Sequence, residues 1–390
     1  MNMRRTGPVD VAIVGGGPAG LVTALACRRE GLEVEVIERR RPPLDKACGE
    51  GLMPDGVAIL RSLGIDFDSP DGLRHHPFHG IHWIDSDGTR AAGRFPAEPG
   101  RGVRRLDLHD ALVRRAARVG VGVRWGVRVE SLDTAGPTPR LDTSDGPLEA
   151  QCVVGADGLR SRVRQWADLA VGDPAAVTDR SRFGIRRHYA LAPWSNAVEV
   201  YWADDCEAYV TPVAPDEVGI AILWSGRKAS FDGLLRSFPA LAQRLEGADH
   251  TSQDRGAGPL RQKVRRAVRG RVALVGDAAG YVDAITGEGL SLALHQALAL
   301  ARALAQASRT DGQPTTYEWT RRRLALLPDG LTHLLLTIER YPWLRRRMIR
   351  GLARDPALFS RLLALHTREV PVHRLGWSTA PRLVWGLVRA

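Results

Sequence analysis

The first forty residues alternate between short apolar runs and turn residues. Residues 9–14 read VDVAIV, and a glycine-rich turn leads from them into the apolar-periodic stretch LVTALACRREG. A second apolar run, LEVEVIE, ends at Glu38. Short apolar runs bounded by glycines indicate buried strands, and the longer periodic stretch indicates a helix. The pattern predicts strand, tight turn, helix and strand, which is the beginning of a parallel sheet.

The turn carries the spacing Gly15-x-Gly17-x-x-Gly20. Gly15 permits the sharp turn, Gly17 lets the backbone approach a pyrophosphate, and Gly20 allows the helix to pack closely on the strand. The helix N-terminus faces the phosphate charge. Glu38, about 20 residues further on, stands where a carboxylate accepts hydrogen bonds from ribose hydroxyls. The combination of two strands, helix and acid predicts a dinucleotide site.

Two later segments repeat the change from apolar strand to turn. VVGADGLRSRVR occupies 153–164, and VALVGDAAGYVDAITGEGLSLALHQA occupies 272–297. The second begins as a buried strand and continues into a helix that starts near Gly289, whose first amides have no partner within the helix. Such amides can hold the electron-rich edge of a reduced flavin. Asp277, at the end of that strand, is placed to bind a ribityl hydroxyl.

Residues 183–224 are rich in β-branched and aromatic residues and are interrupted by turn residues at regular intervals. This predicts a meander of antiparallel strands. Aromatic residues on strands more often fill a core than line a pocket. Although a role in the core stays open for each of them, the candidate substrate contacts are Tyr201, Tyr209 and Trp224. Trp202 is a neighbouring candidate.

The C-terminal segment 321–390 alternates basic and apolar positions and is interrupted at Pro328, Pro342, Pro356 and Pro371. We expect several short amphipathic helices that cover an active-site cavity. The chain has 390 residues, a net charge of +11 and 55 basic residues. Fourteen arginines lie in this segment, with Trp343, Trp377 and Trp385 among them. A solvated helical cap explains the charge, and peripheral contact with a membrane or an acidic carrier protein is the alternative.

The four cysteines are far apart and form no CxxC pair, so the sequence indicates neither a disulfide framework nor a zinc site. The short basic start has no long apolar run behind it, and no run approaches the roughly 20 residues of a membrane span. We expect a cytoplasmic protein, with peripheral membrane contact as an open alternative. A histidine cluster at 75, 76, 79 and 82 lacks nearby acids or cysteines and is interpreted as a surface loop.

The motifs GGGPAG, GADGLRSRVR and GDAAGYVDAITGEG, in this order, resemble those of the p-hydroxybenzoate hydroxylase-like flavoproteins. This class includes aromatic hydroxylases, geranylgeranyl reductases and FAD-dependent halogenases. The resemblance implies FAD, a flavin-side role for Arg105, and a turn-shaping role for Asp157. The cofactor-binding residues that it implies are Gly15, Gly17, Pro18, Ala19, Gly20, Glu38, Arg39, Cys48, Gly49, Arg105, Val129, Asp157, Gly276, Asp277, Gly287, Gly289 and Leu290.

The expected fold is a Rossmann-like α/β FAD-binding domain with an inserted α+β, antiparallel-sheet substrate domain and a helical C-terminal unit. The FAD domain is expected over 1–72, 101–180 and 256–320, the substrate domain over 73–100 and 181–255, and the basic helical unit over 321–390. A second glycine fingerprint is missing from the sequence. The resemblance therefore implies that NADH or NADPH docks transiently and reduces the flavin.

Three reaction classes stay open. The preferred hypothesis is a monooxygenase that uses O2 to hydroxylate or epoxidise a lipophilic, aromatic or quinol-like molecule. The segment Cys48-Gly49-Glu50-Gly51 resembles a stretch of geranylgeranyl reductases, so saturation of prenyl double bonds is the alternative. A halogenase is disfavoured because the chain has three lysines and none in the expected region. A flavin-binding, nucleic-acid-binding protein is disfavoured because no recognition motif accompanies the basic tail. The sequence assigns no metal ligand and no catalytic acid or base.

Overall fold

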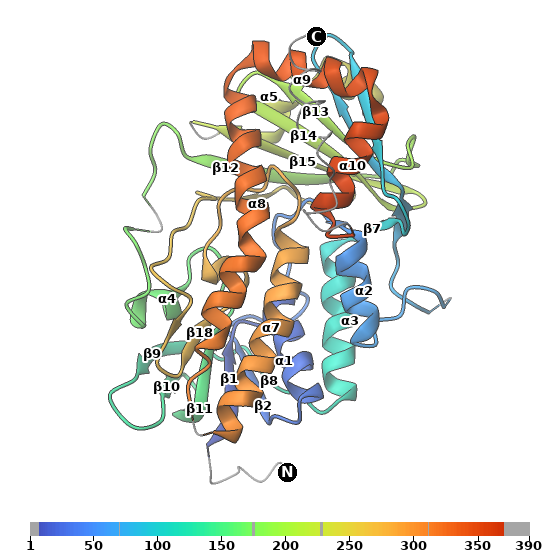
Figure 1. Ribbon diagram of the computed structural model, residues 1–390. Helices are drawn as coiled ribbons and strands as arrows, with labels where there is room; N and C mark the ends of the chain where they lie inside the picture. The colour runs from blue at the N-terminus through green and yellow to red at the C-terminus, as the bar shows by residue number, and fades with distance from the viewer. Residues whose placement is uncertain (1–7, 70, 174–175, 227–228, 311, 370–390) are drawn as a thin grey trace.

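The computed structural model describes residues 8–69, 71–173, 176–226, 229–310 and 312–369. Figure 1 shows two sheets, the second above the first in that view, with a long C-terminal helix running beside both. Pro371, Trp377 and Trp385, which enter the predictions above, lie outside the described residues.

The first sheet has eight strands, ordered β17-β18-β11-β1-β2-β8, with β10 and β9 joined at the side. The strands β18, β11, β1, β2 and β8 run parallel, and the buried VDVAIV run forms β1 between β11 and β2. Strands of a parallel sheet are covered on both faces, which explains their nearly continuous apolar character. The bounds are β1 Val9–Val14, β2 Val34–Glu38, β8 Gly122–Trp125, β9 Val129–Asp133, β10 Arg140–Thr143, β11 Leu148–Gly155, β17 Val268–Arg269 and β18 Val272–Leu274.

Helices cover this sheet and share its core. Helix α1 follows the glycine turn, packs against α7 and α3, and is buried along most of its length. Leu108 and Leu112 of α3 are buried in the same core, as expected from their helical spacing. The bounds are α1 Pro18–Arg29, α2 Pro54–Ser62, α3 Arg105–Arg118, α4 Arg162–Trp166 and α7 Gly289–Arg309, with a 3-10 turn η1 at Gly276–Ala279.

The second sheet has seven strands in the order β16-β12-β15-β14-β13-β5-β6. Strands β13, β14 and β15 form the expected antiparallel meander, but β12 lies beside β15 rather than β13, and β13 pairs with β5 in parallel. The bounds are β5 Gly80–Ile84, β6 Arg90–Arg94, β12 Arg182–Tyr189, β13 Val198–Ala203, β14 Cys206–Ala214, β15 Glu217–Ser225 and β16 Arg255–Ala257. Helices α5 (Phe231–Leu235) and α6 (Pro239–Arg244) contribute to the core on one face.

The interpretation of the histidine cluster as a surface loop is wrong for two of its members. His76 lies in β4 (His76–Phe78) and His82 in β5. Strand β4 joins β3 (Gly51–Leu52) and β7 (Gly100–Gly102) in a small third sheet. Among the described residues, no group of three histidines, cysteines or acids is arranged to hold a metal ion.

Three helices close the fold: α8 Thr316–Arg340, α9 Pro342–Arg354 and α10 Pro356–His366. Pro342 and Pro356 begin helices, where a missing amide costs nothing. The expected break at Pro328 is absent, and α8 continues through it. The Leu324 carbonyl, four residues earlier, has no amide to bind at Pro328 and instead accepts a hydrogen bond from Arg368 Nη2 at 3.2 Å. Within the described residues, no helix is both long and apolar enough to cross a bilayer.

Candidate functional site

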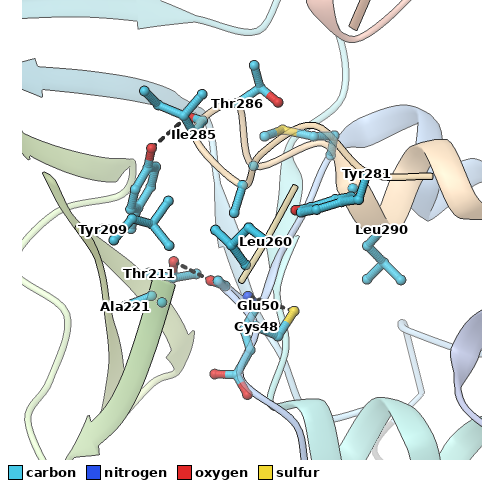
Figure 2. Close-up of a pocket in the computed structure, with 18 of the residues that line it drawn as sticks. Cys48, Glu50, Tyr209, Thr211, Ala221, Leu260, Tyr281, Ile285, Thr286 and Leu290 are labelled. Atoms are coloured by element: carbon cyan, nitrogen blue, oxygen red, sulfur yellow. Dashed lines mark hydrogen bonds between the residues drawn. The ribbon is translucent and has the colours of Figure 1, made fainter. Parts of the chain in front are cut away.

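A cavity of about 340 Å³ lies between the two sheets. Its walls come from the turn after β1, segment 46–53, the start of α7, the second sheet and helices α8–α10. Figure 2 shows Tyr209, Thr211 and Ala221 on one side of it and Tyr281 and Leu290 on the other. The C-terminal helices therefore contribute to the cavity wall, as their amphipathic pattern predicts.

The glycine turn leaves open space where a phosphate group would lie. Gly15 has φ +114°, and a β-carbon there would stand 2.5 Å from the Ala156 carbonyl oxygen. A β-carbon on Gly20 would stand 1.9 Å from the Gly15 oxygen, so helix and turn could not pack as they do. Gly17, the N-cap of α1, lines the cavity with Pro18 and Ala19, and no side chain caps this helix. The uncapped amides and the open space fit the pyrophosphate of a dinucleotide.

Glu38 lies where the sequence predicts it, at the end of β2 beside this turn. Its Oε2 accepts a hydrogen bond from the Gly16 amide at 2.9 Å, and Oε1 accepts one from the Arg40 amide at 2.9 Å. Two amide donors fix the carboxylate at the end of the strand. Arg39 is exposed, whereas Val129 is buried in the main core. Neither Arg39 nor Val129 lines the cavity.

Asp277 and Gly276 line the cavity from the end of β18. Lys46 Nζ lies 2.7 Å from Asp277 Oδ2. Burial favours the neutral carboxyl, but Lys46, Arg105 and Arg164 outweigh it and hold the pKa of Asp277 below its usual range. Asp277 is therefore an ionised acceptor, which fits a ribityl hydroxyl.

Arg164 joins the motif GADGLRSRVR, to which it belongs, to the motif GDAAGYVDAITGEG. Its side chain is buried, with 1% of the residue exposed. Its guanidinium donates to the carbonyl oxygens of Leu159, Asp277 and Ala278 and to the Gln262 side chain. Asp157 does not line the cavity, and its Oδ2 accepts from the amides of Arg162 and Val163 at the start of α4. Its position agrees with the turn-shaping role.

Helix α7 starts at the cavity, where Gly287, Gly289 and Leu290 form part of the wall. Gly287 has φ +67°, and a β-carbon on Gly289 would lie 3.1 Å from the Tyr281 hydroxyl oxygen. No side chain caps this helix either. Its free amides face the position that the flavin ring is expected to take. Burial raises the pKa of Tyr281 well above its usual value, so its phenol keeps its proton.

Segment 46–51 also forms part of the cavity wall. Cys48 and Gly49 line the cavity, and Thr211 Oγ1 donates to the Gly49 carbonyl at 2.7 Å. Cys48 Sγ accepts from the Glu50 amide at 3.4 Å. These contacts agree with a packing role for Cys48 and provide no base beside the thiol.

Glu50 was not among the predicted site residues, although it stands in the CGEG segment. It has φ +59° and is buried. Its carboxylate accepts a hydrogen bond from the Arg105 amide at 2.7 Å and contacts His188 Nε2 on β12. Arg105 begins α3 and lines the cavity, and its buried Nε has no hydrogen-bond partner among the residues that the structure describes. The predicted arginine is thus positioned by an unpredicted acid.

The three candidate substrate contacts lie on different faces of the second sheet. Tyr209 lines the cavity and donates from its hydroxyl to the Ile285 carbonyl at 2.6 Å. Tyr201 and Trp224 do not line it: both belong to the core beneath α5 and α6, and the Tyr201 hydroxyl donates to Glu199. Strand alternation turns Tyr201 and Trp224 away from this cavity, whereas Tyr209 faces it. Trp202, in contrast, packs with residues of α9 and α10.

Sequence reasoning missed His366, the last residue of α10. It lines the cavity, is 8% exposed, and its Nε2 has no hydrogen-bond partner among the described residues. Its Nδ1 lies 3.3 Å from Glu288 Oε2, in the turn before α7. Burial lowers the pKa of His366 to about 4, so the imidazole is neutral at pH 7. No local sequence signal marks this contact between α10 and the start of α7.

Comparison with known proteins agrees with this geometry. A family profile described as the FAD binding domain matches residues 8–230 and 234–326. A menaquinone reductase of Mycobacterium tuberculosis is 30% identical over 312 residues, covering 73% of this chain and 74% of the relative. A 6-methylpretetramide 4-monooxygenase of Streptomyces rimosus is 29% identical over 318 residues, covering 74% of this chain and 73% of the relative.

A solved structure shares the fold. CmlS, a flavin-dependent halogenase, superposes with a TM-score of 0.77 at 20% identity, covering 99% of this chain and 77% of that one. The expected architecture, a Rossmann-like domain with an antiparallel sheet and C-terminal helices, is confirmed. The chain therefore belongs to the FAD binding domain family of FAD-dependent oxidoreductases.

Proposed function

We propose that this enzyme is an NAD(P)H-using monooxygenase that inserts oxygen into a lipophilic molecule carrying a phenolic or quinol hydroxyl. His366 carries the proposal: a buried, neutral imidazole with an unpartnered Nε2 faces a cavity whose remaining walls are mostly apolar. Such a site suits an apolar molecule with a hydroxyl to bind. Bound FAD would store the reducing electrons and activate O2.

The apolar walls support this chemistry in a second way. Leu223 and Leu260 line the sheet side, and Leu352, Phe359 and Leu363 line the helix side. These side chains would keep water from the reacting atoms, which oxygen transfer requires. The hydroxyls of Tyr209 and Thr211 already donate to backbone carbonyls, so they compete little for the substrate. The neutral His366 imidazole would accept a hydrogen bond from the substrate hydroxyl, and so orient the ring and polarise its O–H bond.

A long-chain alkylphenol and NAD(P)H under isotopically labelled O2 test the proposal. The expected result is substrate-stimulated oxygen uptake and a product that contains one labelled oxygen atom. In the His366→Gln variant we expect about a hundredfold loss of kcat/KM and a changed pH profile, with FAD still bound. NAD(P)H oxidation that yields only hydrogen peroxide with every phenol and quinol tried would contradict the proposal.

A reductase is the second candidate, because the Tyr281 hydroxyl lies beside the start of α7 with its proton retained. Reduction of a double bond needs a proton as well as a hydride, and Tyr281 stands where it could supply one. The Tyr281→Phe variant separates the candidates. Loss of anaerobic reduction of a prenyl lipid in this variant would establish the reductase, whereas unchanged oxygen insertion would favour the monooxygenase.

A further inference from the structure

Large apolar side chains are exposed along one side of α8 and at the start of α9. Trp319, Leu326, Leu334, Tyr341 and Trp343 are 62%, 76%, 53%, 44% and 63% exposed. The first three follow one another at intervals of seven and eight residues, which places them on the same face of α8, and Tyr341 and Trp343 follow at the junction with α9. We call these five residues the α8–α9 surface. Large exposed apolar groups gathered on one face indicate a contact with something apolar.

Arginines lie beside the apolar residues of the α8–α9 surface. Arg323 lies over the Trp319 ring at 4.5 Å, and Arg340 over the Tyr341 ring at 5.8 Å. Arg346 and Arg350 are exposed on α9. Residues 316–369 contain eleven arginines and five acids. Tryptophan and tyrosine between arginines are typical of the boundary between lipid headgroups and acyl chains, where anionic lipids add electrostatic attraction.

The cavity opens at the same surface. Leu334 both lines the cavity and is 53% exposed, so it stands at a mouth, and Leu331 and Leu335 continue the wall inward. All three are apolar, as are Met348 and Leu352 beyond them. An acidic carrier protein would bring its substrate on a polar arm, for which this apolar mouth is a poor match. A molecule dissolved in a bilayer could enter directly.

We propose that the α8–α9 surface docks the enzyme on an anionic lipid membrane and admits a membrane-dissolved substrate past Leu334. The substrate part of this proposal rests on the proposed function; the docking part does not. Docking is peripheral: the side chains of the surface enter the headgroup region, and the rest of the protein stays outside.

Co-sedimentation of the full-length, FAD-loaded protein with vesicles tests docking without any turnover. We expect binding to phosphatidylcholine mixed with phosphatidylglycerol, about tenfold weaker binding to phosphatidylcholine alone, and loss of binding at high salt. The Trp319→Asp/Leu326→Asp variant should bind the anionic vesicles about tenfold less, because two inserting side chains are lost. Neither residue lines the cavity.

Matched controls distinguish an effect of the α8–α9 surface from a general effect of changing charge or removing apolar side chains. Val171 and Val177 are exposed apolar residues outside the α8–α9 surface, and Val171→Asp/Val177→Asp should leave binding unchanged. Arg323→Glu/Arg346→Glu should weaken binding, whereas Arg128→Glu/Arg236→Glu, at exposed positions elsewhere, should weaken it less.

Equal binding of the wild type and the Trp319→Asp/Leu326→Asp variant would overturn the docking proposal. So would an absence of vesicle binding with salt-sensitive capture by immobilised acidic carrier protein. Membrane binding that depends on the surface but is followed by no oxygen insertion would leave docking established and count against the proposed function instead.

Discussion

Glu38 shows how one side chain joins a strand to a turn. Its two oxygens accept from the amides of Gly16 and Arg40, so the carboxylate spans the end of β2 and the glycine turn. A ribose would meet a carboxylate that is already held in place. Orientation of this kind reduces the ordering that binding must impose.

Replacing Glu38 with alanine removes both acceptors and should weaken FAD binding by about tenfold or more. We expect Glu38→Ala to lose its yellow colour on gel filtration, measured as the ratio of flavin to protein absorbance. Glu35→Ala, on the same strand but paired with Arg124, is the control and should keep its flavin. Full retention of FAD in the Glu38 variant would refute the assignment.

The glycine positions could be predicted from the sequence because their requirement is local. The substrate side could not, because the face of each residue depends on the register between strands. Tyr209 pairs with Val200 and Ala221, and all three line the cavity. Tyr201 pairs with Ala208 and therefore points the other way. His366 was missed because it meets Glu288 only after α8–α10 have folded back.

At the scale of elements, a buried charge cluster joins β12, β14, the loop before α7 and the end of α8. Arg182 contacts three acids: Glu207, Asp283 and Glu339. One guanidinium cannot neutralise three buried carboxylates. Burial, opposed by Arg182, raises the pKa of Glu207 to about 8, and the pKa values of Asp283 and Glu339 are also raised.

This cluster predicts a loss of stability as the pH rises. The folded protein holds a proton on Glu207 up to about pH 8, whereas the unfolded chain releases it near its ordinary value of 4.5. Glu207 therefore stabilises the folded protein fully below about pH 4.5, and this stabilisation is lost as the pH rises through about 8. We expect Glu207→Gln to flatten the fall in melting temperature between about pH 4.5 and about 8, while the exposed Glu246→Gln leaves the slope unchanged. An unaltered slope in the Glu207 variant would contradict the assignment.

Helix α10 packs against β6 through Phe359 and Leu363. A β-carbon on Gly93 would lie 2.9 Å from the Phe359 ring, which also contacts Trp83. Phe359→Ala should therefore lower the free energy of unfolding by about 3 kcal/mol or more and enlarge the cavity. Phe359→Leu should cost less. Urea denaturation measures both, and equal stability of all three proteins would show that α10 is loosely held.

At the scale of the whole molecule, Arg368 connects the end of the described chain to three other places. Its guanidinium reaches Asp55 on α2, Glu288 before α7 and the Leu324 carbonyl beside Pro328. The same side chain thus contacts both α8 at Pro328 and the turn before α7. The sequence could not predict this, because Pro328 indicates a break unless a distant donor replaces its missing amide.

Arg368→Ala should leave two buried acids and one carbonyl without their cation. We expect a melting temperature lower by several degrees and a faster release of FAD, measured by the return of flavin fluorescence. Arg361→Ala, exposed on α10, is the matched control. Wild-type FAD release from the Arg368 variant would show that α10 does not secure the cofactor turn.

Arg164 has a consequence for how this protein can diverge over evolutionary time. Three of its four partners are carbonyl oxygens of Leu159, Asp277 and Ala278. Every amino acid brings a carbonyl, so point mutations at these neighbours leave the acceptors in place. We therefore expect substitutions to be tolerated better at these neighbours than at Arg164 itself. We therefore expect a change of substrate to come from side chains of the cavity wall rather than from this junction between two motifs.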